Sequence, residues 1–182
     1  MWKLVVFAVV SALIAAASWR SLRKPVTHGL PRFLAWEVIA ALVLLNVEHW
    51  FADSWSILQL FSWVLLVGSL LLVGSGLYLL RTYGRPRDEG AQPTNYAWEN
   101  TSQLIDVGVY RYVRHPMYAS LLLLTWGVFL KNVSFTGFLL SVTASTCLVI
   151  TAHVEEREDM TRFGEAYSVY RRRTRWFIPF IY

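Results

Sequence analysis

The chain alternates long apolar runs with short polar segments. Five runs are dominated by apolar residues: 2–19, about 33–51, about 57–80, 116–130 and about 134–153. A helix needs roughly 20 apolar residues to cross a bilayer, and these runs approach or reach that length. The pattern predicts an all-α, polytopic membrane protein with about five transmembrane helices. Residues 1–80 would hold three of them. Residues 81–182 would hold a loop, a helical hairpin and a C-terminal helix in the same integrated domain.

The fourth and fifth runs predict an antiparallel helical hairpin, because only Lys131-Asn132-Val133 joins them. The first arm, 116–130, would rise only about 22 Å at 1.5 Å per residue, whereas the hydrocarbon core of a bilayer is about 30 Å thick. We therefore expect the corner at His115-Pro116 to be recessed below the membrane surface. A lipid-soluble substrate could then reach it sideways.

The charges lie in blocks between the apolar runs. The chain is 55% hydrophobic and 16% charged, with a net charge of +5. This placement is typical of membrane topology, so we predict membrane lipids as partners and no nucleic acid. All of the 17 Lys and Arg residues except Lys3 and Lys131 follow the first or third span or lie in the tail. The positive-inside rule then puts the N-terminus outside and the C-terminus and long loop in the cytoplasm.

Two spans carry unusual residues. The second contains Glu37, Asn46, Glu48 and His49. Ionisable groups at membrane depth are candidate functional residues, but these lie near the ends of the span, which favours a structural role. The third contains the small residues Gly68, Ser69, Gly74, Ser75 and Gly76. Small residues at helical spacing allow helices to approach closely in lipid, so this face is predicted to be a packing surface.

Polar segments follow the third and fifth spans. Residues 81–115 form a long loop rich in aromatic side chains, which favours a structured ligand-binding loop over disorder. In the tail, Met160, Phe163, Tyr167 and Tyr170 recur at helical spacing. This spacing predicts an amphipathic helix lying on the membrane interface, with Glu158 and Arg162 as an i,i+4 ion pair.

The stretch Gly108–Tyr118 is polar, aromatic and basic, and it leads directly into an apolar run. Pro116 suits the first turn of a helix, and the residue before a proline is pushed towards an extended conformation. His115 should therefore lie at a corner, beside a helix N-terminus that attracts negative groups. An anionic or zwitterionic ligand would suit this corner.

The residues do not indicate a metal site or a disulfide. The four histidines are scattered and Cys147 is the single cysteine, so neither a metal site nor an intrachain disulfide is predicted. Glu155-Glu156 could equally belong to a solvated helix start. The residues alone indicate a membrane enzyme or lipid-binding protein with a cytoplasmic pocket.

Two linked motifs carry a family resemblance. Gly108-Val109-Tyr110 followed by Arg114-His115-Pro116-Met117-Tyr118 resembles the motif of the isoprenylcysteine carboxyl methyltransferase family, shared more loosely with phospholipid methyltransferases. The second half is matched by Glu155-Glu156, Phe163-Gly164-Glu165, Tyr167, Tyr170 and Ile178-Pro179-Phe180. The resemblance covers about residues 94–182. It implies an enzyme that transfers a methyl group from S-adenosylmethionine to a lipophilic small molecule or prenylated substrate.

The resemblance also implies which residues contact the cofactor: Asn95, Ser102, Gln103, Leu104, Ile105, Tyr110, His115, Pro116, Met117, Tyr118 and Glu155. The residue types are compatible with that role. Aromatic faces suit a sulfonium cation, helix N-terminal amides suit a carboxylate, and a glutamate accepts hydrogen bonds from an ammonium or from ribose hydroxyls. No catalytic base is assigned, because a carboxylate or thiolate acceptor needs none near neutral pH.

One position departs from the family pattern. The prenylcysteine enzymes carry a substrate-binding arginine four residues before the cofactor-binding glutamate, and this chain has Thr151 there. Arg157 and Arg175 are weaker candidates for holding the substrate. Phospholipid N-methylation, a membrane reductase using NADPH and a non-enzymatic lipid-binding protein stay open as alternatives. The methyl acceptor and the oligomeric state are also open.

Overall fold

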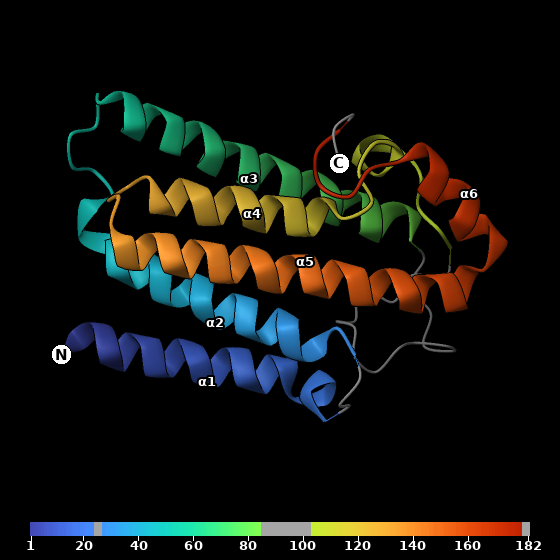
Figure 1. The fold of residues 1–182 in the computed structure, drawn as a ribbon, viewed down its shortest axis with the longest axis horizontal. Helices are drawn as coiled ribbons and strands as arrows, with labels where there is room; N and C mark the ends of the chain where they lie inside the picture. The colour runs from blue at the N-terminus through green and yellow to red at the C-terminus, as the bar shows by residue number, and fades with distance from the viewer. Residues whose placement is uncertain (24–26, 85–102, 180–182) are drawn as a thin grey trace.

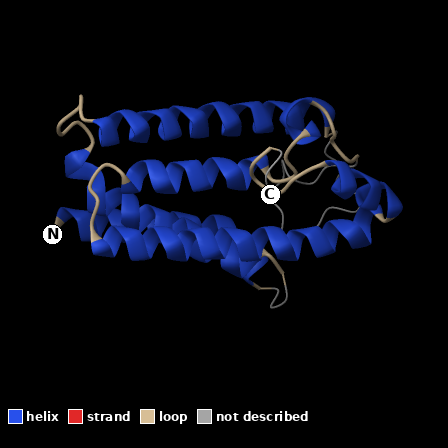
Figure 2. Ribbon diagram, turned by 45° about the horizontal axis from the view of Figure 1, so that its top comes forward, coloured by secondary structure: helices blue, strands red, loops and turns tan. Residues whose placement is uncertain are grey.

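A computed structural model describes residues 1–23, 27–84 and 103–179, and in these residues every regular element is a helix. Figures 1 and 2 show a bundle of long helices, with the last helix of the described chain at one end. The elements in chain order are α1 (Trp2–Leu22), α2 (Gly29–Asn46), η1 (Val47–His49), α3 (Ile57–Tyr83), η2 (Gly108–Arg111), α4 (Pro116–Phe129), α5 (Phe135–Phe163) and α6 (Glu165–Arg173).

The prediction of an all-α membrane protein is confirmed. Four helical segments are long and apolar enough to cross a membrane: α1, α2 with η1, α3 and α5. The fifth apolar helix, α4, is shorter. In the bundle, α3 packs on α4, α4 on α5, α5 on α2, and α2 on α1 (Figure 1). Many apolar side chains on α1 and α3 face outward, as expected for helices surrounded by lipid.

Helix α4 begins further inside the bundle than the end of the neighbouring helix α3. It has 14 residues, which rise about 21 Å, and it begins beside Gly76 of α3. A Cβ atom at Gly76 would lie 3.1 Å from the Met117 sulfur. Because α3 continues to Tyr83, about 10 Å further along its axis, the His115-Pro116 corner lies inside the end of the bundle.

Two expectations about the tail were wrong. The second arm of the hairpin does not end near 153, since α5 continues to Phe163. Residues 160–170 do not form one helix on the interface, because Gly164 has a φ of 55° and the chain turns there before α6. Positive φ is readily available only to glycine. After this turn, Tyr167 and Tyr170 point into the protein and are each only 2% exposed.

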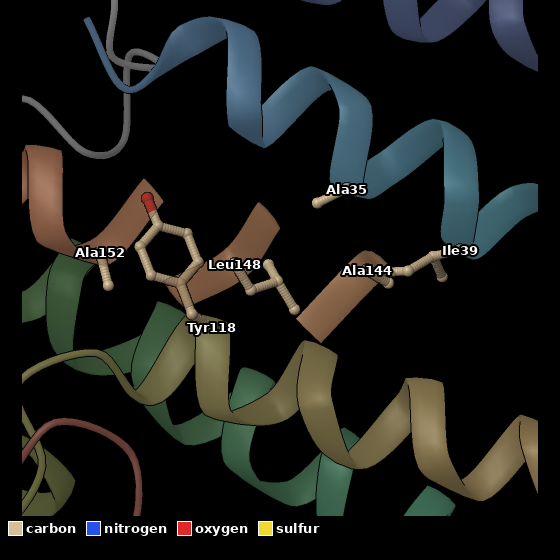
Figure 3. Packing of buried hydrophobic residues seen from close by; sticks show 6 residues of the cluster. All are labelled: Ala35, Ile39, Tyr118, Ala144, Leu148 and Ala152. Carbon is tan, nitrogen blue, oxygen red and sulfur yellow. The ribbon is translucent and has the colours of Figure 1, made fainter. Parts of the chain in front are cut away.

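The apolar core lies where α2, α4 and α5 meet. Figure 3 shows its buried residues, of which Ala35 and Ile39 come from α2, Tyr118 from α4, and Ala144, Leu148 and Ala152 from α5. Alanines let helix backbones approach closely, and the larger side chains fill the remaining space. This packing places Tyr118, the last residue of the His-Pro-Met-Tyr motif, against α5.

The polar residues of the second span connect helices, as the structural interpretation predicted. Ser11 of α1 donates a hydrogen bond to Glu37 at 2.5 Å, and Lys3 lies 3.0 Å from Glu48. Asn46 donates to the Val128 carbonyl of α4 at 2.9 Å. The small residues of α3 divide between two environments. Ser69 and Gly76 are buried, whereas Gly74 has open space beside it and Gly68 and Ser75 are only partly buried.

Candidate active site

The corner begins with a glycine turn. Gly108 opens η2 with a φ of 58°, and a Cβ atom there would lie 2.6 Å from a methyl of Leu79. Both the backbone conformation and the lack of space therefore require glycine. The turn aims Tyr110 inward, where it is buried. His115 then precedes Pro116, which begins α4.

The segment that follows α6 is bonded to this corner. We call residues 174–177 the C-terminal strap. Its backbone forms a parallel β-bridge between Arg175 and Val113. The amides of Arg114 and His115 donate to the carbonyls of Arg175 and Trp176 at 2.7 and 3.1 Å. Because these bonds use backbone atoms, they hold the corner whatever side chains the strap carries.

A buried ion pair joins the corner, α5 and the strap. The Arg114 Nε donates to the Glu156 carboxylate at 2.5 Å, and the two side chains are 6% and 4% exposed. The Arg114 guanidinium also donates to the carbonyls of Thr174, at 2.5 Å, and Arg171, at 3.2 Å. A buried charge needs a partner and hydrogen bonds to offset its desolvation, and this arrangement supplies both.

His115 lies in an aromatic and acidic environment. Its ring stacks on Tyr118, with centroids 5.6 Å apart, and Trp176 and Phe177 of the strap lie beside it. Its Nδ1 is 3.6 Å from Glu155, and its Nε2 is 3.7 Å from Glu156. Burial alone would lower the pKa of His115, but these carboxylates outweigh it and raise the pKa to about 9. The imidazole is therefore positively charged near neutral pH and cannot accept a proton.

A cavity lies between the corner, the end of α3, the last two turns of α5, and α6. Eight of the residues that the resemblance implied as cofactor contacts line it: Leu104, Ile105, Tyr110, His115, Pro116, Met117, Tyr118 and Glu155. The two halves of the motif, separated by the α4–α5 hairpin, therefore meet in one site.

The remaining predicted site residues are exposed or fall outside the described residues. Gln103 is exposed and does not line the cavity, and Asn95 and Ser102 fall outside the described residues. Arg157 and Arg175 are both exposed, away from the cavity lining. The side chain of Arg157 contacts His153 at 3.0 Å.

Seven further residues line the cavity that were not predicted to contact the cofactor, although four of them belong to the two motifs: Leu80, Arg114, Asp159, Arg162, Phe163, Tyr167 and Tyr170. Asp159, Arg162 and Phe163 follow Glu155 at intervals of four, seven and eight residues, which is the spacing of one helix face. That signal was present in the sequence once Glu155 had been identified. For Tyr167 and Tyr170, burial raises the pKa of each hydroxyl, so both stay neutral.

A second buried histidine supports α5 from the other side. The His28 side chain is fully buried, and its Nδ1 lies 2.7 Å from the Glu158 carboxylate. Burial lowers the pKa of His28, but the hydrogen bond to Glu158 together with the negative charges of Glu155 and Glu158 outweighs that effect and raises the pKa. This contact ties the start of α2 to the turn of α5 that borders the cavity.

Comparisons with known proteins agree with this geometry. The profile of the phospholipid methyltransferase family matches residues 63–166, more than half of the chain. A methanethiol S-methyltransferase from a Pseudomonas species (strain GM41) is 26% identical over 153 residues, covering 81% of this chain and 54% of that protein. One from Pseudomonas deceptionensis is 25% identical over 192 residues, covering 95% of this chain and 69% of that protein.

A further methanethiol S-methyltransferase, from Crocosphaera subtropica, is 36% identical over 72 residues, covering 40% of this chain and 28% of that protein. The chain thus spans about half the length of the first of these relatives. No solved structure matches. The family match includes all of α4 and α5 and the whole His-Pro-Met-Tyr corner, as the resemblance predicted. This integral membrane protein belongs to the phospholipid methyltransferase family.

Proposed function

We propose that this protein is a membrane methyltransferase that uses S-adenosylmethionine to methylate a small thiol. The observation that carries the proposal is the convergence of His115, Tyr118 and Glu155 on one cavity. His115 and Tyr118 lie at the start of α4 and Glu155 lies near the end of α5, so only the folded hairpin brings them together. Family membership supports methyl transfer as the reaction.

The residues around the cavity fit the cofactor's functional groups. Glu155 would accept hydrogen bonds from the cofactor's ammonium or ribose hydroxyls. The side chain of the N-cap residue, His115, makes no capping hydrogen bond, so the first turn of α4 could offer its amides to a carboxylate. The rings of Tyr110 and Tyr118 are suited to a sulfonium cation. Bound there, S-adenosylmethionine would supply an activated methyl group.

Two observations favour a thiol as the acceptor. The three relatives are named methanethiol S-methyltransferases. In addition, the charged imidazole of His115 would stabilise a thiolate, which is the nucleophilic form of a thiol. A short alkanethiol is also apolar enough to dissolve in lipid, in keeping with the expectation of a lipophilic substrate. The cavity would contribute mainly by aligning the nucleophile with the methyl group.

The site is proposed to open on the cytoplasmic side. The support is the distribution of charge, because Lys and Arg residues concentrate after the first and third spans and in the tail. The corner is recessed relative to the end of α3, which would let an acceptor enter from the lipid. Labelling single cysteines placed at residues 112 and 133 in intact cells would test the orientation, with residue 112 expected to be protected.

The acceptor can be identified directly. The purified protein in lipid nanodiscs would be given methyl-labelled S-adenosylmethionine with methanethiol, longer alkanethiols, a farnesylated cysteine or phosphatidylethanolamine. We expect label in a volatile thioether. Label only in a base-labile ester or in the phospholipid amine would overturn the thiol assignment. Absence of binding to S-adenosylhomocysteine would overturn the cofactor assignment. Glu155→Gln should abolish the signal, and the exposed Glu165→Gln should not.

A further inference from the structure

Four acidic residues lie close together near the end of α5, and three of them have basic partners. Glu155 lies 3.6 Å from His115, Glu156 bonds to Arg114, and Glu158 contacts His28. Asp159 differs. Within residues 1–23, 27–84 and 103–179, no hydrogen bond or ion pair reaches its carboxylate, although the nearby positive charges of His115 and Arg162 attract it.

Asp159 lines the cavity. It follows Glu155 by one helical turn and shares its face of α5. Phe163 and Tyr167 border the same space. Asp159 is partly buried, and a titratable group that lines a cleft without a bonded partner is a candidate functional residue. The geometry therefore gives Asp159 a role towards a ligand, since it has none in holding the described part of the fold.

We propose that Asp159 is the proton acceptor of the reaction, taking the proton that the acceptor thiol loses as its sulfur is methylated. This inference rests on the proposed function. The other groups in the cavity are less suited to the task. His115 carries a proton near neutral pH, because its pKa is raised to about 9. Glu155 faces that charge, and the hydroxyls of Tyr167 and Tyr170 stay protonated.

The step balances without any further reactant. The S–H bond of the thiol breaks and its proton passes to a carboxylate oxygen of Asp159. The freed sulfur electron pair forms the new bond to the methyl carbon. The bond between that carbon and the sulfonium breaks, and its electron pair stays on the cofactor's sulfur, which becomes a neutral thioether. The proton then leaves Asp159 for water when the product departs.

An alternative role for Asp159 is as a counter-ion for the cofactor's own positive charges. The two roles predict different results. A counter-ion is needed for binding and affects every acceptor equally. A proton acceptor is needed only when the thiol arrives protonated, and it leaves cofactor affinity unchanged. Acceptors of different acidity therefore separate them: an alkanethiol is protonated at neutral pH, whereas an electron-poor aromatic thiol is already ionised.

The test compares Asp159→Asn with wild type on both thiols in nanodiscs. We expect the turnover of the alkanethiol to fall about 100-fold, the usual size of a lost general base. The aromatic thiol should lose far less, and affinity for S-adenosylhomocysteine should stay the same. Asp159→Ala should regain turnover of the alkanethiol when formate is added. Glu165→Gln, an exposed carboxylate on α6, is the matched control.

Three results would overturn the inference. One is an equal loss with both thiols, and another is weakened binding of S-adenosylhomocysteine, which would indicate the counter-ion. The third is unchanged turnover of the alkanethiol. Failure of the proposed function looks different, because the wild-type protein would then methylate neither thiol. If Asp159→Asn loses its helical circular dichroism signal, the comparison uses Asp159→Ala instead, with and without formate.

Discussion

Arg114 and Glu156 are 42 residues apart in the chain, yet their side chains meet at 2.5 Å in a nearly solvent-free setting. Arg114 belongs to the corner before α4, and Glu156 belongs to α5. The guanidinium also holds the carbonyl of Thr174, at the start of the strap. One ion pair thus joins three segments that surround the cavity.

Breaking this pair should be severe. Glu156→Gln leaves the Arg114 charge buried with a neutral partner, and removing one member of a buried pair costs about 3–5 kcal/mol of unfolding free energy. Thermal unfolding in detergent, followed by tryptophan fluorescence, would measure the loss. The exposed pair between Arg172 and Glu165 provides the control, and Glu165→Gln should leave the melting temperature unchanged. Equal melting temperatures for the two variants would contradict the assignment.

Stability should decrease as the solution becomes alkaline. The pKa of His115 is raised from 6.5 to about 9 in the folded protein. A histidine with a raised folded pKa contributes stability that is fully present below its unfolded value and lost as pH rises through the folded value. The melting temperature should therefore fall between about pH 6.5 and pH 9, more steeply for wild type than for His115→Gln. His28 has a raised pKa as well, so His28→Gln should remove a separate part of the slope.

Cofactor affinity should depend on residues that line the cavity. Losing a hydrogen bond to a charged group costs about 1.5–3 kcal/mol, so Glu155→Gln should weaken the binding of S-adenosylhomocysteine roughly 10- to 100-fold in calorimetric titrations. Gln103→Ala is the informative comparison. The family resemblance implies that Gln103 contacts the cofactor, but the residue is exposed and away from the cavity. We expect its affinity to match wild type, and a large loss would mean that the cavity boundary is wrong.

The strap should be required for the site and dispensable for the bundle. A variant ending at Arg173 lacks the bonds from Arg175 and Trp176 to the corner and exposes the His115 ring. It should keep its helical circular dichroism while S-adenosylhomocysteine binding disappears. A variant ending at Phe177 keeps the strap and serves as the control. If the shorter variant still binds, the strap is not part of the site.

A side chain at Gly164 should lower the stability of the protein. Its φ of 55° is strained for other residues, and such strain costs about 1–3 kcal/mol. A Cβ atom added there would have no neighbouring atom within 4 Å, so the penalty of Gly164→Ala would come from the backbone alone. Gly74→Ala also enters open space but within the regular α3 helix, where alanine is favoured. Melting temperatures should therefore fall for the first variant and hold or rise for the second.

The sequence by itself determined the apolar helices of this fold and the corner between two of them. Apolar runs long enough to cross lipid defined the spans, and Pro116 defined the start of α4 and the corner at His115. Glu155 was identified through its motif, and the short connection at 131–133 predicted the helical hairpin. These conclusions were accessible because each depends on local chain chemistry or on a connection too short to lead elsewhere.

The tertiary structure alone decided how the site closes. Apolar spacing in residues 160–170 predicted a helix facing lipid, because periodicity identifies an apolar face but not the surface it covers. The turn at Gly164 directs Tyr167 and Tyr170 into the protein instead. Likewise, the sequence does not distinguish the roles of neighbouring acidic residues. Which of them meets a positive charge depends on partners up to 130 residues away, and only the packed chain leaves Asp159 facing the cavity.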